Sequence, residues 1–148
     1  MEREIRVGLC GCGVIGEGLV AALTEHASII EERTGARLRL TVAADKDTAR
    51  REVVRAMAPG VTLLEDAFDV VQRDDVDILV ELIGGVEVAD RLVRAALQAK
   101  KHVVTANKAL LAKRGEQLLS VDPGSTRVIA DDHSFVLGKA KLDDPGHE

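Results

Sequence analysis

The stretch Ile5–Gly16 reads IRVGLCGCGVIG, a short apolar run that leads directly into three glycines in the pattern G-x-G-x-x-G. The apolar residues Ile5–Cys10 are typical of a buried β-strand, and the helical spacing of apolar residues that follows predicts a helix beginning inside the glycine run. In such a strand–turn–helix, Gly11 permits the tight turn, Gly13 lets a phosphate group approach the backbone, and Gly16 lets the helix pack on the strand. The stretch therefore predicts a turn built to bind a dinucleotide.

The helix after this turn is predicted to continue to Gly35. Its apolar side chains recur at helical spacing, so they should form one face that packs on a sheet. These residues are Ile15, Leu19, Leu23, Ala27 and Ile30. The start of this helix should present unpaired backbone N–H groups and a partial positive charge to a pyrophosphate. We therefore expect the pyrophosphate of a dinucleotide at Gly11, Gly13, Val14, Ile15 and Gly16.

Strands and helices alternate through the remainder of the chain. Strands are predicted at 38–44, 62–64, 76–83, 102–105 and 127–130, and helices at 47–57, 66–72, 88–99 and from about 107 onward. This alternation predicts an α/β fold of the Rossmann type, a doubly wound, mostly parallel sheet with helices on both faces. The pattern fails beyond residue 131, so we expect a dinucleotide-binding domain at 1–138 and a loose tail at 139–148. The pattern does not decide whether 135–137 adds an edge strand.

Two segments follow neighbouring strands of this predicted sheet. Glu81–Gly85 ends one strand and Thr105–Lys108 ends the next. Ligands of open α/β sheets bind at the carboxyl ends of the strands, so both segments should face one site. The residues expected to lie beside a nicotinamide ring are Ile83, Gly84, Gly85, Thr105, Ala106 and Asn107. Lys108 can handle a proton during hydride transfer if it is desolvated, and the alternative is an ordinary solvated lysine. Glu81 interrupts an apolar strand, and the pattern assigns it no role.

Asp45 ends the second predicted strand, where dinucleotide-binding domains carry an acidic residue that bonds the adenosine ribose. A carboxylate there would accept hydrogen bonds from the ribose hydroxyls and repel a 2′-phosphate, which favours NAD over NADP. Lys46, Arg50 and Arg51 follow closely and could accommodate that phosphate instead, so NADP stays possible. The structural alternative is that Asp45 only caps the next helix.

Composition excludes several classes of function. The chain has 148 residues, a net charge of −5 and two aromatic residues, Phe68 and Phe135, so it lacks the basic face and stacking platforms of a nucleic-acid-binding protein. Its apolar runs fall well short of the roughly 18 residues that a membrane helix needs. No secretory signal precedes the first strand, so we expect a cytoplasmic protein. Cys10 and Cys12 suit neither a disulfide framework nor a zinc site, and no metal site is predicted.

Three motifs together resemble one known family. They are Val7–Gly16 (VGLCGCGVIG), Val80–Gly85 (VELIGG) and Lys101–Ala112 (KHVVTANKALLA). In this order and spacing they resemble the N-terminal nucleotide-binding domain of the homoserine dehydrogenases, over roughly residues 4–121. The resemblance implies NAD(P)-dependent interconversion of L-aspartate 4-semialdehyde and L-homoserine, on the route from aspartate to threonine, methionine and isoleucine.

The resemblance also bears on single residues. It implies that Lys108 lies near the nicotinamide and the substrate, as a catalytic or cofactor-contacting group. NADP-using members of the family often carry a basic residue at the position of Asp45, so the aspartate here again favours NAD.

Members of the family continue into a separate substrate and dimerisation domain. From Val128 this sequence instead reads VIADDHS, and the substrate-binding residues of that domain have no counterpart. We therefore expect a truncated domain that binds NAD, is inactive alone, and forms a homodimer or works with a separate substrate-domain chain. Two alternatives stay open: a non-catalytic nucleotide-sensing module, and a dehydrogenase of another amino acid that acts with a partner chain.

Overall fold

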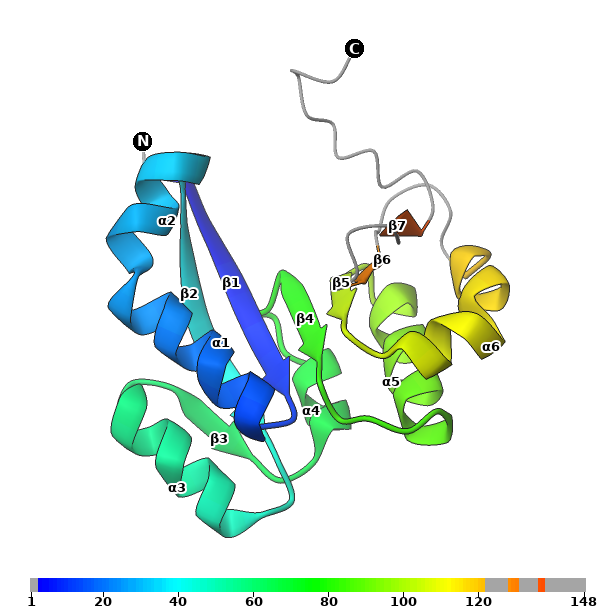
Figure 1. Cartoon of the computed structure of the whole chain (residues 1–148), viewed down its shortest axis with the longest axis horizontal. Helices are drawn as coiled ribbons and strands as arrows, with labels where there is room; N and C mark the ends of the chain where they lie inside the picture. Colours follow the sequence, from blue (N-terminus) through cyan, green and yellow to red (C-terminus); the bar gives the residue numbers. More distant parts are fainter. Residues whose placement is uncertain (1–2, 122–127, 131–135, 138–148) are drawn as a thin grey trace.

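The computed structural model describes residues 3–121, 128–130 and 136–137, and strands alternate with helices along them (Figure 1). The strands are β1 (Arg3–Cys10), β2 (Ala36–Ala44), β3 (Thr62–Leu64), β4 (Ile78–Glu81), β5 (His102–Thr105), β6 (Val128–Ala130) and β7 (Val136–Leu137). The helices are α1 (Val14–Glu25), α2 (Ala27–Thr34), α3 (Thr48–Met57), α4 (Ala67–Val71), α5 (Glu87–Gln98) and α6 (Lys108–Leu119).

The described strands form one sheet in the order β3-β2-β1-β4-β5-β6-β7. Neighbours from β3 to β6 are parallel, and β7 pairs antiparallel with β6. The strand order reverses between β1 and β4, which is the switch point where open α/β sheets bind ligands. The predicted α/β fold with a mostly parallel sheet is therefore confirmed. Val136–Leu137 supplies an edge strand, whereas the predicted tail at 139–148 lies outside the described residues.

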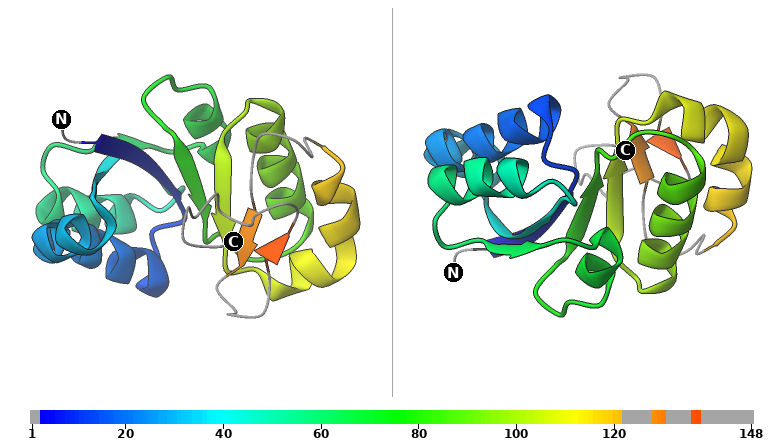
Figure 2. Two further views of the ribbon diagram at one scale, coloured as in Figure 1. Left: turned by 90° about the horizontal axis from the view of Figure 1, so that it is seen from above. Right: turned by 90° about the horizontal axis from the view of Figure 1, so that it is seen from below.

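Helices cover both faces of the sheet (Figure 2). On one face α1, α2 and α3 enclose a hydrophobic cluster that contains Val20 and Val54; on the other, α4, α5 and α6 enclose one that contains Leu92 and Leu110. Successive strand residues point to opposite faces, so Ala43 of β2 belongs to the first cluster and its two neighbours to the second. No helix within the described ranges is long and apolar enough to cross a membrane.

The first predicted helix is wrong in two respects. It is broken at His26 into α1 and α2, and just before the break the Thr24 hydroxyl donates to the carbonyls of Val20 (2.8 Å) and Ala21 (3.3 Å). A hydroxyl bonded back to the preceding turn competes with the helix ladder and bends the helix. Ile15 of the predicted apolar face is also 64% exposed, whereas Leu19, Leu23 and Ile30 of that face pack in the first hydrophobic cluster. The buried residues of α1 are Gly16, Val20 and Leu23.

Side chains cap the starts of three described helices. Asp47, Asp66 and Asn107 each accept a backbone N–H from the first turn of α3, α4 and α6, at 2.8, 2.9 and 3.0 Å. Because Asp47 caps α3, the alternative that Asp45 is its cap is wrong. By contrast, α1 follows Gly13 without a side-chain cap. The start of α1 therefore keeps backbone donors that a ligand can use.

Candidate functional site

The glycine-rich turn joins β1 to α1 at the carboxyl edge of the sheet. Gly11 has a φ of 103°, which favours glycine, and a Cβ at this position would lie 2.7 Å from the backbone of Leu82. A Cβ at Gly16 would come well within 3.0 Å of the Gly11 carbonyl oxygen, closer than real Cβ atoms approach. Packing of the turn therefore requires glycine at both positions.

Gly13 differs from the other two glycines of the motif. The nearest atom to a Cβ at Gly13 would be Nη1 of Arg50, at 3.8 Å, so packing within the protein does not require glycine here. Directly after it, α1 begins without a cap, and Val14 and Ile15 are largely exposed. Open space above the backbone and an uncapped helix start are what a pyrophosphate needs for close approach.

Asp45 follows the end of β2 and is hydrogen-bonded to the glycine-rich turn. Its Oδ2 accepts the Cys12 N–H at 2.8 Å, and its Oδ1 accepts the Asp47 N–H at 2.8 Å. The side chain is 11% exposed, and Arg50 Nη1 lies 3.9 Å from Oδ2. The Arg51 guanidinium donates to the Asp45 carbonyl oxygen at 2.6 Å. Each carboxylate oxygen has two lone pairs, so Asp45 retains capacity to accept a ligand hydroxyl.

A cavity of about 680 Å³ opens beside Asp45. Its walls include four predicted site residues, Gly11, Asp45, Lys46 and Ile83. Phe68 of α4 and Arg91 of α5, which no sequence motif marks, also line it. The Arg91 guanidinium carbon lies 5.8 Å from the centre of the Phe68 ring. Phe68 thus brings an apolar ring to the cavity wall and Arg91 a planar cation, both of them groups on which a purine can stack.

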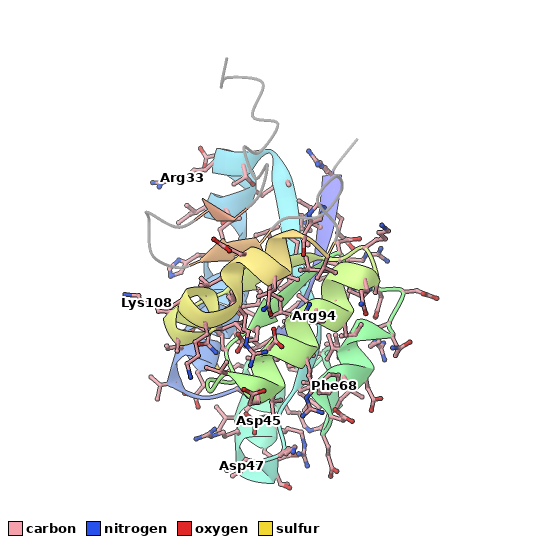
Figure 3. The ribbon with its side chains drawn as sticks, turned by 90° about the vertical axis from the view of Figure 1, so that its right-hand side faces the viewer. Arg33, Asp45, Asp47, Phe68, Arg94 and Lys108 are labelled. Carbon is pink, nitrogen blue, oxygen red and sulfur yellow. The ribbon has the colours of Figure 1, made fainter. Side chains whose placement is uncertain are left out.

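A second cavity, of about 330 Å³, lies between the turn and the ends of β4 and β5. Its walls include the predicted residues Ile15, Gly84, Ala106, Asn107 and Lys108, together with Glu81 and Leu82. Lys108 is the first residue of α6, and Figure 3 shows its side chain projecting outward from the ribbon. Asp45 lies lower in the same view, away from Lys108. Most residues predicted for the two ends of a dinucleotide therefore line two different cavities, whereas Ile83, predicted beside the nicotinamide ring, lines the first cavity with Asp45.

Three of the predicted contact residues, the buried Thr105 and Gly16 and the exposed Gly85, are absent from the walls of both cavities. Thr105 is fully buried, and its hydroxyl donates to Glu81 Oε1 at 2.6 Å. Gly16 is likewise buried against the Gly11 carbonyl. Gly85 accepts a hydrogen bond on its carbonyl oxygen from the Asn107 side-chain amide. Because Thr105 has no exposed surface, we correct its predicted role from direct contact to support of the site.

The two cysteines lie in and beside the turn as free thiols. Burial, together with the nearby Asp45 carboxylate, raises the pKa of Cys12 to about 11. Burial, with Glu81 nearby, also raises the pKa of Cys10. Both thiols are therefore protonated at neutral pH, a state that is a poor nucleophile and a poor metal ligand. Among the described residues, no three or more His, Cys, Asp or Glu side chains are grouped to hold a metal ion.

The doubly wound sheet, the turn open above Gly13 and the cavities beside the switch point define a dinucleotide-binding domain. A family model described as "Homoserine dehydrogenase, NAD binding domain" matches residues 11–129. Homoserine dehydrogenases of Neisseria gonorrhoeae and Bacillus subtilis are each 37% identical, over 116 and 118 residues. The chain belongs to the family of homoserine dehydrogenase NAD-binding domains, as the sequence motifs predict.

Solved structures agree with this assignment. A homoserine dehydrogenase from Thiobacillus denitrificans matches with a TM-score of 0.78 and 39% identity, over 87% of this chain and 30% of that one. The S. aureus homoserine dehydrogenase at pH 8.5 matches with a TM-score of 0.77 and 26% identity, over 88% of this chain and 33% of that one. The Neisseria and Bacillus alignments cover 78% and 80% of this chain but 26% and 27% of those relatives. The chain thus spans about a quarter of the length of the curated relatives it matches.

Proposed function

We propose that this chain binds NAD(H) and forms the cofactor-binding domain of a homoserine dehydrogenase. The open space above Gly13, beside the uncapped start of α1, is the observation that carries the proposal. A pyrophosphate there would accept hydrogen bonds from the N–H groups of Val14 and Ile15 and meet the positive end of the helix. The adenosine would extend toward Asp45 and the first cavity, and the nicotinamide toward the second.

The proposal includes a preference for NAD over NADP. The Asp45 carboxylate at the ribose end would accept hydrogen bonds from the ribose hydroxyls and repel a 2′-phosphate. Arg50, 3.9 Å from Asp45 Oδ2, and Lys46 in the cavity wall reduce that repulsion. We therefore expect a preference of about tenfold rather than complete exclusion of NADP.

Lys108 is the residue to which we assign the proton transfer. The nicotinamide ring, when bound, supplies the hydride chemistry. Lys108 lines the second cavity at the first residue of α6, where its ammonium would donate a hydrogen bond to the reacting substrate oxygen and help to move its proton. Gly84, Ala106 and Asn107 line the same cavity and would orient the ring. The substrates proposed are L-homoserine and L-aspartate 4-semialdehyde.

Turnover in this proposal requires a substrate domain as well, because a hydride site without an oriented substrate gives no reaction. A separate substrate-domain chain is one partner that we propose. We also propose that two copies associate, since large apolar side chains outside the cofactor site, Ile29 and Val53, are exposed as well. Light scattering at high concentration tests this, and a monomer would count against it. A cytoplasmic location is part of the proposal, in keeping with the free thiols of Cys10 and Cys12.

Calorimetric titration with NAD, NADH, NADP and NADPH tests cofactor binding, because the chain has no Trp or Tyr to report it by fluorescence. We expect NADH to bind about tenfold more tightly than NADPH. Asp45→Asn should bring the two affinities closer together, since it removes the charge but keeps one acceptor oxygen. If none of the four nucleotides binds, the proposal is wrong. If NADPH binds more tightly, only the cofactor preference is wrong.

A further inference from the structure

One acidic side chain beside the second cavity has no part in the function proposed so far. Glu81, the last residue of β4, is fully buried. Its Oε1 accepts the Thr105 hydroxyl at 2.6 Å, and its Oε2 accepts the N–H groups of Ile83 at 2.8 Å and Gly84 at 3.4 Å. A carboxylate removed from water is tolerated only when donors of this kind satisfy its oxygens. The position of Glu81 is therefore tied to the positions of these donors.

The hydrogen bonds continue from Glu81 to the start of α6. Glu81 and Thr105 are paired residues at the ends of β4 and β5, so their side chains lie next to each other. The Thr105 hydroxyl, which donates to Glu81, accepts the Asn107 N–H at 3.0 Å. Asn107 Oδ1 accepts the Leu110 N–H at 3.0 Å and so caps α6, while its side-chain amide donates to the Gly85 carbonyl.

These contacts form a closed ring. From Glu81 the ring passes through the loop at 82–85 to Asn107, then to Thr105 and back to Glu81. The loop at 82–85 and the start of α6 both contribute to the walls of the second cavity. A ring of hydrogen bonds that joins both walls fixes their separation, because the walls cannot move apart without breaking at least one of these bonds.

We propose that Glu81 is a positioning residue, which holds the two walls of the second cavity at the separation that a nicotinamide ring needs. The proposal rests on the proposed function, because it takes the second cavity as the nicotinamide end of the site. Lys108 directly follows Asn107, so the same ring of hydrogen bonds sets where the Lys108 side chain begins.

Three variants of the full chain test this role by calorimetry with two ligands, NADH and ADP-ribose. Glu81→Gln replaces one acceptor oxygen by an NH₂ donor, so one of the donors in the ring of hydrogen bonds, either the Thr105 hydroxyl or the Ile83 N–H, loses its acceptor. Thr105→Val removes the hydroxyl with almost no change of shape, and Thr105→Ser is the matched control that keeps it. ADP-ribose lacks the nicotinamide, so its affinity reports whether the remainder of the site is intact.

We expect Glu81→Gln and Thr105→Val to weaken NADH binding about tenfold and to leave ADP-ribose binding within about twofold of the unmodified chain. Thr105→Ser should leave both affinities within about twofold. A loss caused by poor folding would lower both affinities together. If Glu81→Gln does not fold, the Thr105 pair decides the matter alone.

Amide hydrogen exchange provides a readout that needs no cofactor. The N–H groups of Ile83 and Gly84 bond to Glu81, and neither bonds to the Thr105 hydroxyl. Thr105→Val should nevertheless speed their exchange by about tenfold, because it frees Glu81 on its other side, whereas Thr105→Ser should not.

Equal effects on NADH and ADP-ribose, or no effect on either, would overturn the positioning role. Unchanged exchange at Ile83 and Gly84 in Thr105→Val would overturn it as well. If the unmodified chain binds ADP-ribose but not NADH, the assignment of the second cavity fails, and the role of Glu81 fails with it. If it binds neither ligand, the proposed function itself is refuted.

Discussion

Alanine at three glycines of the turn and of α1 should separate folding from binding. At Gly16 a Cβ would collide with the Gly11 carbonyl oxygen, which belongs to rigid backbone. Overpacking of this kind costs about 1–3 kcal/mol, and the higher helix propensity of alanine returns up to about 1 kcal/mol. We therefore expect Gly16→Ala to destabilise the chain by about 1–2 kcal/mol, or about 2–8 °C in melting temperature.

Gly13→Ala should behave in the opposite way. Its Cβ would meet Arg50 Nη1 at 3.8 Å, an ordinary contact, and its φ of −74° suits alanine. Loss of the better N-cap costs about 0.5 kcal/mol. The new methyl group would, however, occupy the space proposed for the pyrophosphate. We expect NADH affinity to fall at least about tenfold, which is about 1.4 kcal/mol.

Thermal unfolding followed by circular dichroism, with calorimetry for NADH, distinguishes the two variants. Gly18→Ala is the matched control, because nothing lies within 4 Å of a Cβ there. It should keep its NADH affinity and gain slightly in stability through helix propensity. If Gly13→Ala binds NADH as tightly as the unmodified chain, or if Gly13→Ala and Gly16→Ala lose stability equally, the roles assigned to these glycines are wrong.

Three further predictions concern other parts of the chain. Arg91→Ala should weaken NADH and ADP-ribose binding alike, about tenfold by calorimetry, since Phe68 and Arg91 lie at the adenosine end; loss of NADH binding alone would contradict this. Iodoacetamide should modify Cys12 in urea but not in the native chain at neutral pH. The free energy of unfolding should also fall as the pH rises from 9.0 toward about 11, because the raised pKa keeps the folded thiol protonated while the unfolded thiol ionises. Arg6 lowers the pKa of Asp77 by hydrogen bonding. The stability that this pair contributes is therefore fully present above the ordinary pKa of an aspartate, and it is lost as the pH falls through the lowered pKa of the folded state. Asp77→Asn should therefore make the free energy of unfolding in urea fall slightly less as the pH is lowered, a small effect because both side chains are partly exposed; an unchanged pH dependence would contradict this.

Local signals in the sequence account for most of the fold. Asp47 and Asn107 predict helix starts because their side chains can reach backbone N–H groups of the first turn, and the structure uses both as caps. The break at His26 escaped prediction, since the bond from Thr24 to the preceding turn leaves the apolar periodicity nearly intact. The exposure of Ile15 also escaped prediction, because Ile15 continues the apolar spacing of Leu19 and Leu23 but lies in the first turn of α1.

The sequence predicts the parts of the candidate site that one contiguous segment forms, but not the contacts between residues far apart in the chain. The glycine turn is contiguous, so its place between a strand and a helix followed from the sequence, whereas the strand order that puts it at the switch point did not. The partnership of Glu81 with Thr105 depends on the register of β4 and β5, whose pairing joins residues 24 positions apart. The sequence indicates only that both residues end neighbouring predicted strands. The contact of Phe68 with Arg91 depends on how α4 packs against α5, which no local pattern specifies.

The two hydrophobic clusters have a consequence for the cooperativity of unfolding. One cluster draws its helices from α1–α3 and the other from α4–α6, but β1, β2 and β4 supply buried residues to both, because successive side chains of a strand point to opposite faces. Loss of the helices on either face would therefore expose strands that also carry the opposite cluster. We expect both clusters to be lost together, in a single unfolding transition. A dinucleotide that contacts Asp45 and Asn107 would reach from the end of β2 to the end of β5 along one edge of this sheet. At a hundred times its Kd it would stabilise the native state by about 2.7 kcal/mol, so saturation should raise the midpoint of that single transition.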